Sequence, residues 1–325
     1  MSHPEIIIPF ALPPAEHAKD LVKLLTSECG LDGLAMLLSR SRTFQREHYD
    51  DFAPALPHEI WLSKRHNSLI TLCHKFRQTL ADGYWFVINP VHLHIASNHL
   101  VLTDYRQLEL LETESRPLFE IARSVFQEAG MELVYGDAAN WLLRADAWSE
   151  MTTTTPDAAC GHNIEIWSPQ GPLARSWRKL QNEIQMEWFI HPVQEQRQRR
   201  AAKVINGMWL WAGTQVGADA NQPGTELQAN SRATELIAMP HLTVLDQLSL
   251  CALANDWGSW AALMQQLDQD WFKPLLSALR ARQLQQVNLV LSNTNTLLQV
   301  QTSTGSLRRF WRSASFKHLS HAPSQ

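Results

Sequence analysis

Short apolar runs bounded by turn residues alternate along this chain with longer stretches in which apolar residues recur at helical spacing. Buried strands are short and flanked by Gly, Pro, Asn or Ser, which predicts strands at 5–10, 84–88, 91–95, 99–102, 132–135, 141–144, 163–166, 235–238 and 287–291. Helical spacing predicts helices around 15–25, 31–38, 60–81, 108–129, 171–189, 241–254 and 257–279. A final hairpin is expected from 297–301 and 307–311, and loops at 151–160 and 216–231. The alternation of both element types indicates an α/β protein.

The spacing of apolar residues changes from helical to strand-like after Gly83. Three short predicted strands follow one another there with only turn residues between them. Such a run is typical of antiparallel pairing. We therefore expect an α/β core sheet flanked by helices and built from residues 1–84 and 216–325, with a smaller α/β part inserted at 85–215. Strands 5–8 and 287–291 are both short and apolar, as strands covered by helices on both faces are, so we expect them in one sheet.

Overall charge narrows the classes of partner. The 325 residues carry a net charge of -4, with a pI near 6.4, which gives no bulk attraction to nucleic acid or to an anionic membrane. The basic cluster at Arg197, Arg199, Arg200 and Lys203 is too short to change this expectation. No segment has the length of a transmembrane helix or the pattern of a signal peptide. With four scattered cysteines and no C-x-x-C pair, we expect a cytoplasmic protein.

The segment from Asn182 to Gly213 concentrates polar side chains on a tryptophan-rich scaffold. The candidate binding residues are Asn182, Glu183, Gln185, His191, Arg197, Asn206, Trp209 and Trp211. One interpretation is a pocket for an anionic metabolite, with Arg197 as a two-pronged anchor. The other is an internal hydrogen-bonded network that joins two layers of the fold, in which Arg197 pairs with an internal acidic group such as Glu183 or Glu187.

Few other residues along the chain suggest a metal site or a catalytic group. His92, His94 and His99 could bind a metal, but no carboxylate or cysteine stands at a supporting spacing, so local hydrogen bonding is the preferred interpretation. We expect no metal and no cofactor. A Cys160–His162 pair would have to be arranged in space rather than by adjacency. The thirteen tryptophans fit core packing better than ligand stacking.

Two stretches resemble a known enzyme family. H-P-V-Q-E-Q-R (191–197) followed by V-I-N-G-M-W-L-W-A-G (204–213) is similar to a segment of archaeal-type cofactor-independent phosphoglycerate mutases, members of the alkaline phosphatase superfamily. The whole chain resembles an uncharacterised proteobacterial family described as regulatory or phosphoglycerate mutase-like. Its recurring phrases here are I-P-F-A-L-P-P, H-N-I-E-I-W-S-P-Q-G, N-E-I-Q-M and R-F-W-R. The resemblance implies an alkaline-phosphatase-like core sheet.

The departures from the mutase pattern bear on activity. The first strand of the mutases ends in a metal-binding aspartate, whereas Pro9-Phe10-Ala11 stands here. Their late Asp-His-Ser-Thr is replaced by Ser292-Asn293-Thr294-Asn295. Two-metal phosphoryl transfer needs such carboxylate and histidine ligands. We therefore expect a non-catalytic regulatory or interaction protein with an unknown protein partner. The alternatives are a sensor of a phosphorylated or carboxylate metabolite, and an enzyme with metal-independent chemistry that uses His162, Glu165 or His191 as acid or base.

Overall fold

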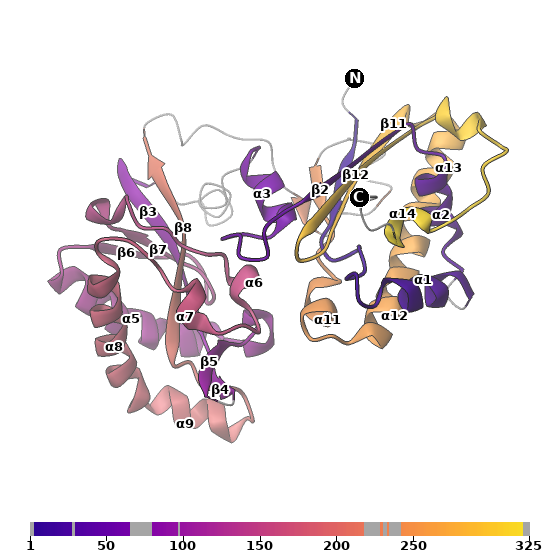
Figure 1. Ribbon diagram of the computed structural model, residues 1–325. Helices are drawn as coiled ribbons and strands as arrows, with labels where there is room; N and C mark the ends of the chain where they lie inside the picture. Colours follow the sequence, from indigo (N-terminus) through magenta and orange to yellow (C-terminus); the bar gives the residue numbers. More distant parts are fainter. Residues whose placement is uncertain are drawn as a thin grey trace. The chain divides into compact units, whose positions relative to one another are not determined.

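A computed structural model describes residues 3–27, 30–65, 80–96, 98–217, 228–229, 233 and 242–320 (Figure 1). The chain divides into two compact units. Unit 1 is formed by residues 1–62 and 225–325, and unit 2 by residues 63–224. Within the described residues, no helix combines the length and the apolar character that crossing a membrane requires.

Unit 1 is built on a mixed sheet whose central strand is β1 (Glu5–Ile8). Across the sheet the order is β2 (Thr43–His48), β12 (Thr296–Ser303), β11 (Gln286–Ser292), β1, β10 (Leu242–Val244) and β9 (Gln228–Ala229). β1 runs parallel to both β10 and β11, while β12 is antiparallel to β11 and β2. The expectation that 5–8 and 287–291 share a sheet is confirmed.

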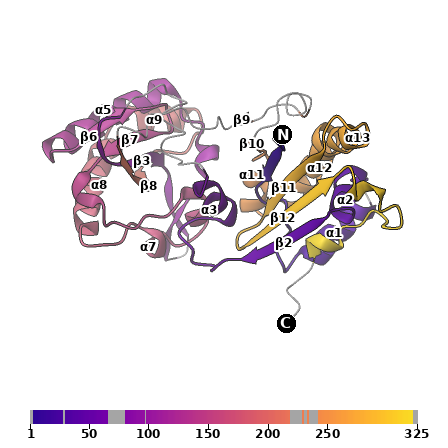
Figure 2. The same ribbon diagram turned by 90° about the horizontal axis from the view of Figure 1, so that it is seen from above.

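Helices α1 (Ala18–Ser27), α2 (Asp32–Ser39), α12 (Trp257–Leu267) and α13 (Lys273–Arg280) cover one face of this sheet (Figure 2). A π-helical turn, Asp268–Phe272, joins α12 to α13, so the predicted helix at 257–279 is essentially continuous. Unit 1 also contains α11 (Ser249–Leu253) and α14 (Lys317–Ser320), and α3 (Pro57–Ser63) spans its boundary at residue 62. The mixed α/β class predicted from the alternating pattern is therefore correct.

The start of α2 is capped by a side chain from a distant part of the chain. Leu31 precedes the helix and makes no side-chain cap. Instead the fully buried carboxylate of Asp268 accepts hydrogen bonds from the backbone N–H groups of Gly33 (3.2 Å) and Leu34 (2.7 Å). A Cβ at position 33 would lie 2.7 Å from the backbone nitrogen of Lys273, so only glycine permits this approach.

Replacing Asp268 by alanine is expected to lower the free energy of unfolding by about 2 kcal/mol, because two buried N–H groups lose their acceptor. Asp270 lies two positions away and is exposed. Asp270→Ala is therefore the matched control and should stay within about 0.5 kcal/mol of wild type. Urea denaturation of the three proteins, followed by circular dichroism, measures the difference. Equal effects of the two substitutions would contradict the capping role.

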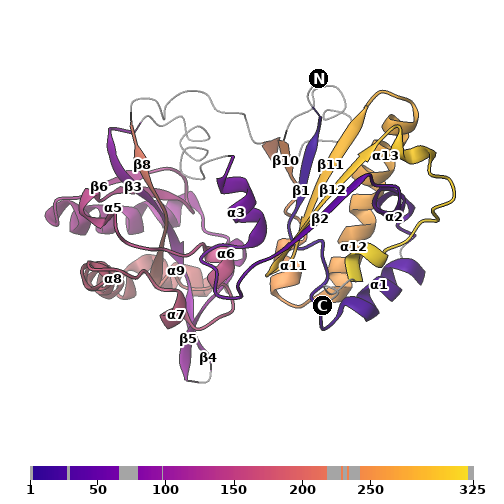
Figure 3. The same cartoon turned by 45° about the horizontal axis from the view of Figure 1, so that its top comes forward.

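Unit 2 contains an antiparallel sheet, as expected for this part of the chain. The turn expected between the strands 84–88 and 91–95 is absent, because Asn89 and Pro90 pair with β8 and the strand continues from Gly83 to Val91. Its order is β6 (Glu132–Tyr135), β7 (Trp141–Arg144), β3 (Gly83–Val91) and β8 (Gly207–Val216). Helices α5 (Glu112–Glu128) and α8 (Ala174–Phe189) pack together along it. A separate hairpin of β4 (Leu93–Ala96) and β5 (His99–Leu102) projects from the unit (Figure 3). The short helices α6 (Pro156–Ala159) and α7 (Ile164–Trp167) precede α8, and α9 (Pro192–Arg199) follows it.

Aromatic rings fill the space between this sheet and its helices. The indoles of Trp141 and Trp188 meet edge to face with centroids 5.9 Å apart, and those of Trp148 and Trp177 do the same at 5.9 Å. All four are at most 1% exposed. Such contacts add to the large apolar area that each ring buries. The interpretation of the tryptophans as core residues holds here.

Three other predicted elements are wrong. Residues 163–166 are not a strand, because the side chain of Asn163 accepts a hydrogen bond from the backbone N–H of Glu165 and starts the helical turn α7. Within the predicted helix 241–254, Leu242–Val244 forms strand β10 and only Ser249–Leu253 is α-helical, since β1 binds this stretch as a parallel neighbour. Instead of a strand at 307–311 there is a 3₁₀ turn at Ser306–Arg308, and β12 forms its hairpin with β11.

Some predicted elements lie wholly or partly outside the described residues. The helix predicted at 60–81 is described only as far as 65 and from 80, and the expected loop 216–231 is described only in part. The predicted strand 235–238 falls outside altogether. Within the expected loop 151–160 the structure has helix α6 and a bridge between Thr152 and Gln170.

Candidate functional site

The residues singled out in the sequence lie on α8, α9 and β8 of unit 2 or, for His191 and Asn206, directly before α9 and β8. Pro192 at the first turn of α9 presets helical geometry, and His191 caps that helix by accepting the backbone N–H of Val193 at Nδ1 (3.2 Å). Helix α8 therefore ends at Phe189, and a new helix, α9, carries Arg197.

Side-chain amides hold the backbone at 205–206 in place. Both polar atoms of the Asn206 amide bind the backbone of Leu93, with Oδ1 accepting its N–H (2.7 Å) and Nδ2 donating to its carbonyl (2.8 Å). Gln194 does the same for Ile205, and Gln185 donates to the carbonyl of Asn206 (2.6 Å). These side-chain amides give the backbone N–H and carbonyl groups the hydrogen-bond partners that a neighbouring strand would otherwise supply.

Arg197 is fully buried and bonded inside the protein. Its guanidinium donates to the carbonyls of Lys203 (2.7 Å) and Leu108 (2.6 Å) and forms an ion pair with Glu114 at the start of α5. The carboxylate partner is Glu114 rather than Glu183 or Glu187, both of which are exposed. Sequence inspection did not single out Glu114, because nothing in the pattern links it to a residue 83 positions away.

Glu114 is the centre of this network. It accepts hydrogen bonds from Arg197, from Arg200 at 2.8 Å and from the backbone N–H of Leu111. Burial alone raises the pKa of Glu114, but the bonds from Arg200 and Leu111 and the two guanidinium charges outweigh it, so the pKa lies below its ordinary 4.5. The carboxylate is therefore ionised at neutral pH and balances the buried charge of Arg197.

The two tryptophans of β8 lie on one face of the strand, as their alternation predicts. Both pack against the small core around Leu93 and Trp167. The indole N–H of Trp209 donates to the carbonyl of Thr154 (2.8 Å), and that of Trp211 donates to Asn89 (2.6 Å). Their polar atoms are thus used within unit 2.

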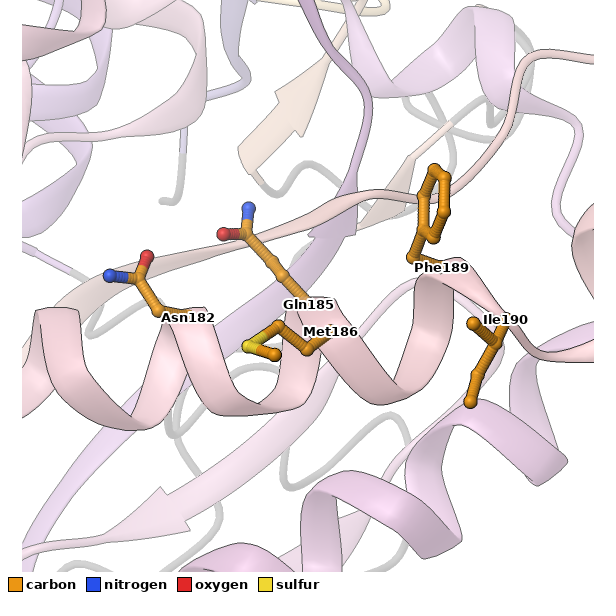
Figure 4. Close-up of a pocket in the computed structure, with 5 residues that line it drawn as sticks. All are labelled: Asn182, Gln185, Met186, Phe189 and Ile190. Carbon is orange, nitrogen blue, oxygen red and sulfur yellow. The ribbon is translucent and has the colours of Figure 1, made fainter.

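The remaining candidates, Asn182, Glu183 and Gln185, lie on α8. Asn182 and Gln185 line a shallow depression of about 560 Å³ together with Met186, Phe189 and Ile190 (Figure 4). Asn182 and Glu183 are exposed, and Gln185 is half-buried. Gln185 reaches the network around α9 through its bond to the Asn206 carbonyl. Asn182 and Glu183 lie outside that network.

The apolar side of the depression is unusually open to solvent. Met186 is 74% exposed, Phe189 84% and Ile190 77%. They lie opposite the buried stripe of Trp177, Leu180, Ile184 and Trp188. The sequence alone could have indicated this exposure. The apolar residues at 186, 189 and 190 do not lie on the helix face that the 3.6-residue spacing assigns to the core.

The three histidines considered for a metal bind three different partners. The Nδ1 atoms of His92, His94 and His99 lie within 3.2 Å of the Val204 carbonyl, the Thr103 hydroxyl and the Asn98 amide oxygen, respectively. The rings of His92 and His94 stack at 6.1 Å, as residues two apart on an extended segment can. Burial, as the largest cause, lowers the pKa of His92.

Cys160 and His162 do not form a reactive pair. Burial, followed by the negative charges of Asp104 and Asp157, raises the pKa of the Cys160 thiol to about 12. The thiol therefore stays protonated at neutral pH, whereas the nucleophilic form is the thiolate. The ring of His162 packs against Trp167, 5.9 Å away.

In unit 1 the carboxyl ends of the parallel strands carry their own polar contacts. Ligands of open α/β sheets bind beyond such ends. Here the Ser292 hydroxyl lies 3.0 Å from Nδ1 of His58, and Asn293 donates to the carbonyl of Pro13. Ser292 is 0% exposed and His58 4%. His58 was not singled out in the sequence, because it lies 234 residues from Ser292.

No protein-family model matches the chain, and no curated protein matches it. Two solved structures are similar in fold. The cofactor-independent phosphoglycerate mutase from Thermoplasma acidophilum DSM 1728 is 9% identical, with a TM-score of 0.42, over 98% of this chain and 94% of that one. The PH0037 protein from Pyrococcus horikoshii is 11% identical, with a TM-score of 0.48, over 93% and 88% of the two chains. At these values the likeness concerns the path of the chain and assigns no activity.

Proposed function

We propose that this protein is a non-catalytic, regulatory binding protein that recognises a protein partner through the exposed face of α8. We define the α8 face as Asn182, Met186, Phe189 and Ile190 together with Arg175, Arg178 and Lys179. The observation that carries the proposal is the exposure of three large apolar side chains at one end of a helix. Exposed apolar side chains that adjoin one another mark interaction sites in soluble proteins.

Charge on the α8 face indicates the chemistry of the partner. Arg175, Arg178 and Lys179 are exposed and precede Asn182 and Met186 on the same side of the helix at spacings of three and four residues. The face is thus mainly basic in its first half and apolar in its second, with the exposed Glu183 between Lys179 and Met186. A segment that carries apolar side chains next to acidic ones complements both halves, as in the binding of amphipathic segments to grooves and helix faces.

The internal bonds of the other candidates support this choice over a metabolite sensor. Arg197 is 0% exposed and satisfied by Glu114 and two carbonyls, and both polar atoms of the Asn206 amide bind Leu93. An anion would have to displace these contacts before it met a donor. Similarly, His191 uses its ring nitrogen to cap α9, which gives the enzyme alternative no support.

Photo-crosslinking in the native cell tests the α8 face directly. Benzoylphenylalanine at position 189 is expected to capture one discrete partner, whereas the same group at the exposed Phe52 of unit 1 should not capture it. With the purified partner, Phe189→Ala should weaken binding by about 30-fold, as removal of a central apolar anchor does, and Phe52→Ala should leave it unchanged. Arg178→Glu should weaken it further through charge repulsion. No adduct at 189, or an adduct only with a second copy of this chain, would refute the proposal.

A further inference from the structure

Positive charge is distributed very unevenly along this acidic chain. Residues 271–325 contain seven Lys and Arg residues and not one Asp or Glu, although the whole chain has a net charge of -4. Four of the seven fall within ten residues, in L-R-R-F-W-R-S-A-S-F-K. Such asymmetry is typical of chains that bind a polyanion with one part of their surface.

The fold brings a second set of arginines to this segment. After β12 the chain turns and runs along the outside of unit 1 to α14, which packs beside α1 (the yellow segment of Figure 1). On its way it contacts residues 39–46, which lead into β2 and form its first part. Arg309 and Arg312 donate to the carbonyls of Ser41 (2.9 Å) and Ser39 (3.2 Å). In return, Arg40 and Arg46 donate to the carbonyls of Leu307 and His318.

We call this surface the basic strip: Arg40, Arg42, Arg46, Arg308, Arg309 and Arg312. Among the described residues, none of the six forms an ion pair. Carbonyl oxygens orient a guanidinium but do not neutralise its charge. The nearest acidic side chain along β2, Glu47, bonds instead to Gln45 and Tyr49. Because successive side chains of a strand point to opposite faces, Glu47 lies on the opposite face of β2 from Arg46. The strip therefore carries uncompensated positive charge.

Two aromatic rings are exposed to solvent between the arginines of the basic strip. Phe310 is 80% exposed and Trp311 70%, with their rings edge to face at 5.3 Å. All thirteen tryptophans lie within the described residues, and the other twelve are buried or half-buried. Trp311 is thus the exception in a protein that otherwise uses tryptophan for its core, and packing does not explain it.

We propose that the basic strip binds single-stranded nucleic acid, with phosphates held by its arginines and bases stacked on Phe310 and Trp311. Arginine and exposed aromatic rings are the two components of single-strand binding surfaces, because every base has a face that stacks. An anionic membrane offers the same charge, and one common means of interfacial binding is an amphipathic helix with a broad apolar face. The segment between the 3₁₀ turn at Ser306–Arg308 and α14 is not helical, and α14 has only four residues.

This inference departs from the expectation drawn from overall charge, which excluded nucleic acid as a partner. That expectation considered clusters along the sequence, whereas the strip combines residues separated by more than 250 positions. Local charge governs the approach of a polyanion more than net charge does. The inference does not depend on the proposed role of α8, which belongs to the other unit.

Fluorescence anisotropy with the full-length protein and a labelled oligothymidylate of about 12 nucleotides provides the test. Trp311→Ala is expected to raise the Kd about tenfold, which corresponds to the loss of one stacked base. The matched control Phe52→Ala removes an equally exposed ring elsewhere in unit 1 and should leave the Kd unchanged. Arg308→Gln should raise the Kd and reduce its dependence on salt, whereas Arg199→Gln makes the same change of charge in unit 2 and should do neither.

Four outcomes would overturn the inference. These are the absence of binding by wild type at low salt, an equal effect of the control variants, tighter binding to duplex than to single-stranded oligonucleotide, and binding to phosphatidylserine vesicles without binding to the oligonucleotide. The last result would assign the strip to a membrane surface. Circular dichroism of each variant separates lost binding from lost structure.

Discussion

Trp188→Ala will lower the free energy of unfolding of unit 2 by about 4 kcal/mol, which is typical of removing a buried tryptophan. The indole is 0% exposed, meets Trp141 edge to face and donates its N–H to the carbonyl of Leu118 at 3.0 Å. The substitution leaves a cavity between α8, α5 and the sheet and removes the hydrogen bond from the indole to the Leu118 carbonyl. Urea denaturation followed by circular dichroism measures the loss.

The next residue of α8 supplies the control. Phe189 is 84% exposed, so Phe189→Ala should change the free energy of unfolding by no more than about 0.5 kcal/mol. The same variant should lose the partner of the α8 face. One helix would thus separate a stability residue from a binding residue at adjacent positions. A loss below about 1 kcal/mol for Trp188→Ala would show that the aromatic core is not packed as described.

The second large effect is expected at the buried ion pair. Glu114→Gln should lower the free energy of unfolding by about 3 kcal/mol at neutral pH, because it leaves the charge of Arg197 buried without a carboxylate. Glutamine keeps the size of the side chain and an oxygen for the N–H of Leu111, but its NH2 group replaces the oxygen that accepts from Arg200 Nε, so the effect combines the lost charge with one lost hydrogen bond. Glu195→Gln on α9 is the control, since its ion pair with Arg199 is exposed on both sides and contributes little.

The pH dependence of the same pair follows from the lowered pKa of Glu114. A carboxylate whose pKa is lower in the folded than in the unfolded state stabilises the fold above its ordinary pKa of 4.5. That stabilisation is lost as the pH falls through the folded-state pKa. The difference between wild type and Glu114→Gln should therefore be largest near neutral pH and shrink below 4.5. A difference that stays constant down to acid pH would contradict the charge argument.

Elements set by local patterning were predictable from the sequence. The strands 132–135 and 141–144 and the helices near 112–128 and 174–189 combine strong periodicity with clear turn or helix-end residues. Residues 242–244 and 163–166 were predicted wrongly for two different reasons. In the first case a distant strand, β1, imposed extended geometry. In the second, one asparagine side chain favoured a helical turn over extension.

In the candidate site, too, features set by local spacing were predictable and features set by distant contacts were not. The two-residue spacing of Trp209 and Trp211 puts them on one face once the segment is a strand, and the sequence indicated that Arg197 binds a carboxylate or an anion. It could not name Glu114, because the choice among acidic residues depends on how α5 and α9 pack. The arginines of the basic strip likewise come from segments at opposite ends of the chain. Contacts of this kind arise only from the fold.

The central position of β1 has a consequence for how the protein is made. Both parallel neighbours of this strand, β10 and β11, lie more than 230 residues later in the chain. At the usual pace of translation, Ile6, Ile7 and Ile8 leave the ribosome roughly 10–50 s before either neighbour exists. Unit 2 is continuous and completes its synthesis in that interval. The nascent chain must therefore keep an apolar strand unpaired while another part of it folds, a situation in which chaperones commonly bind.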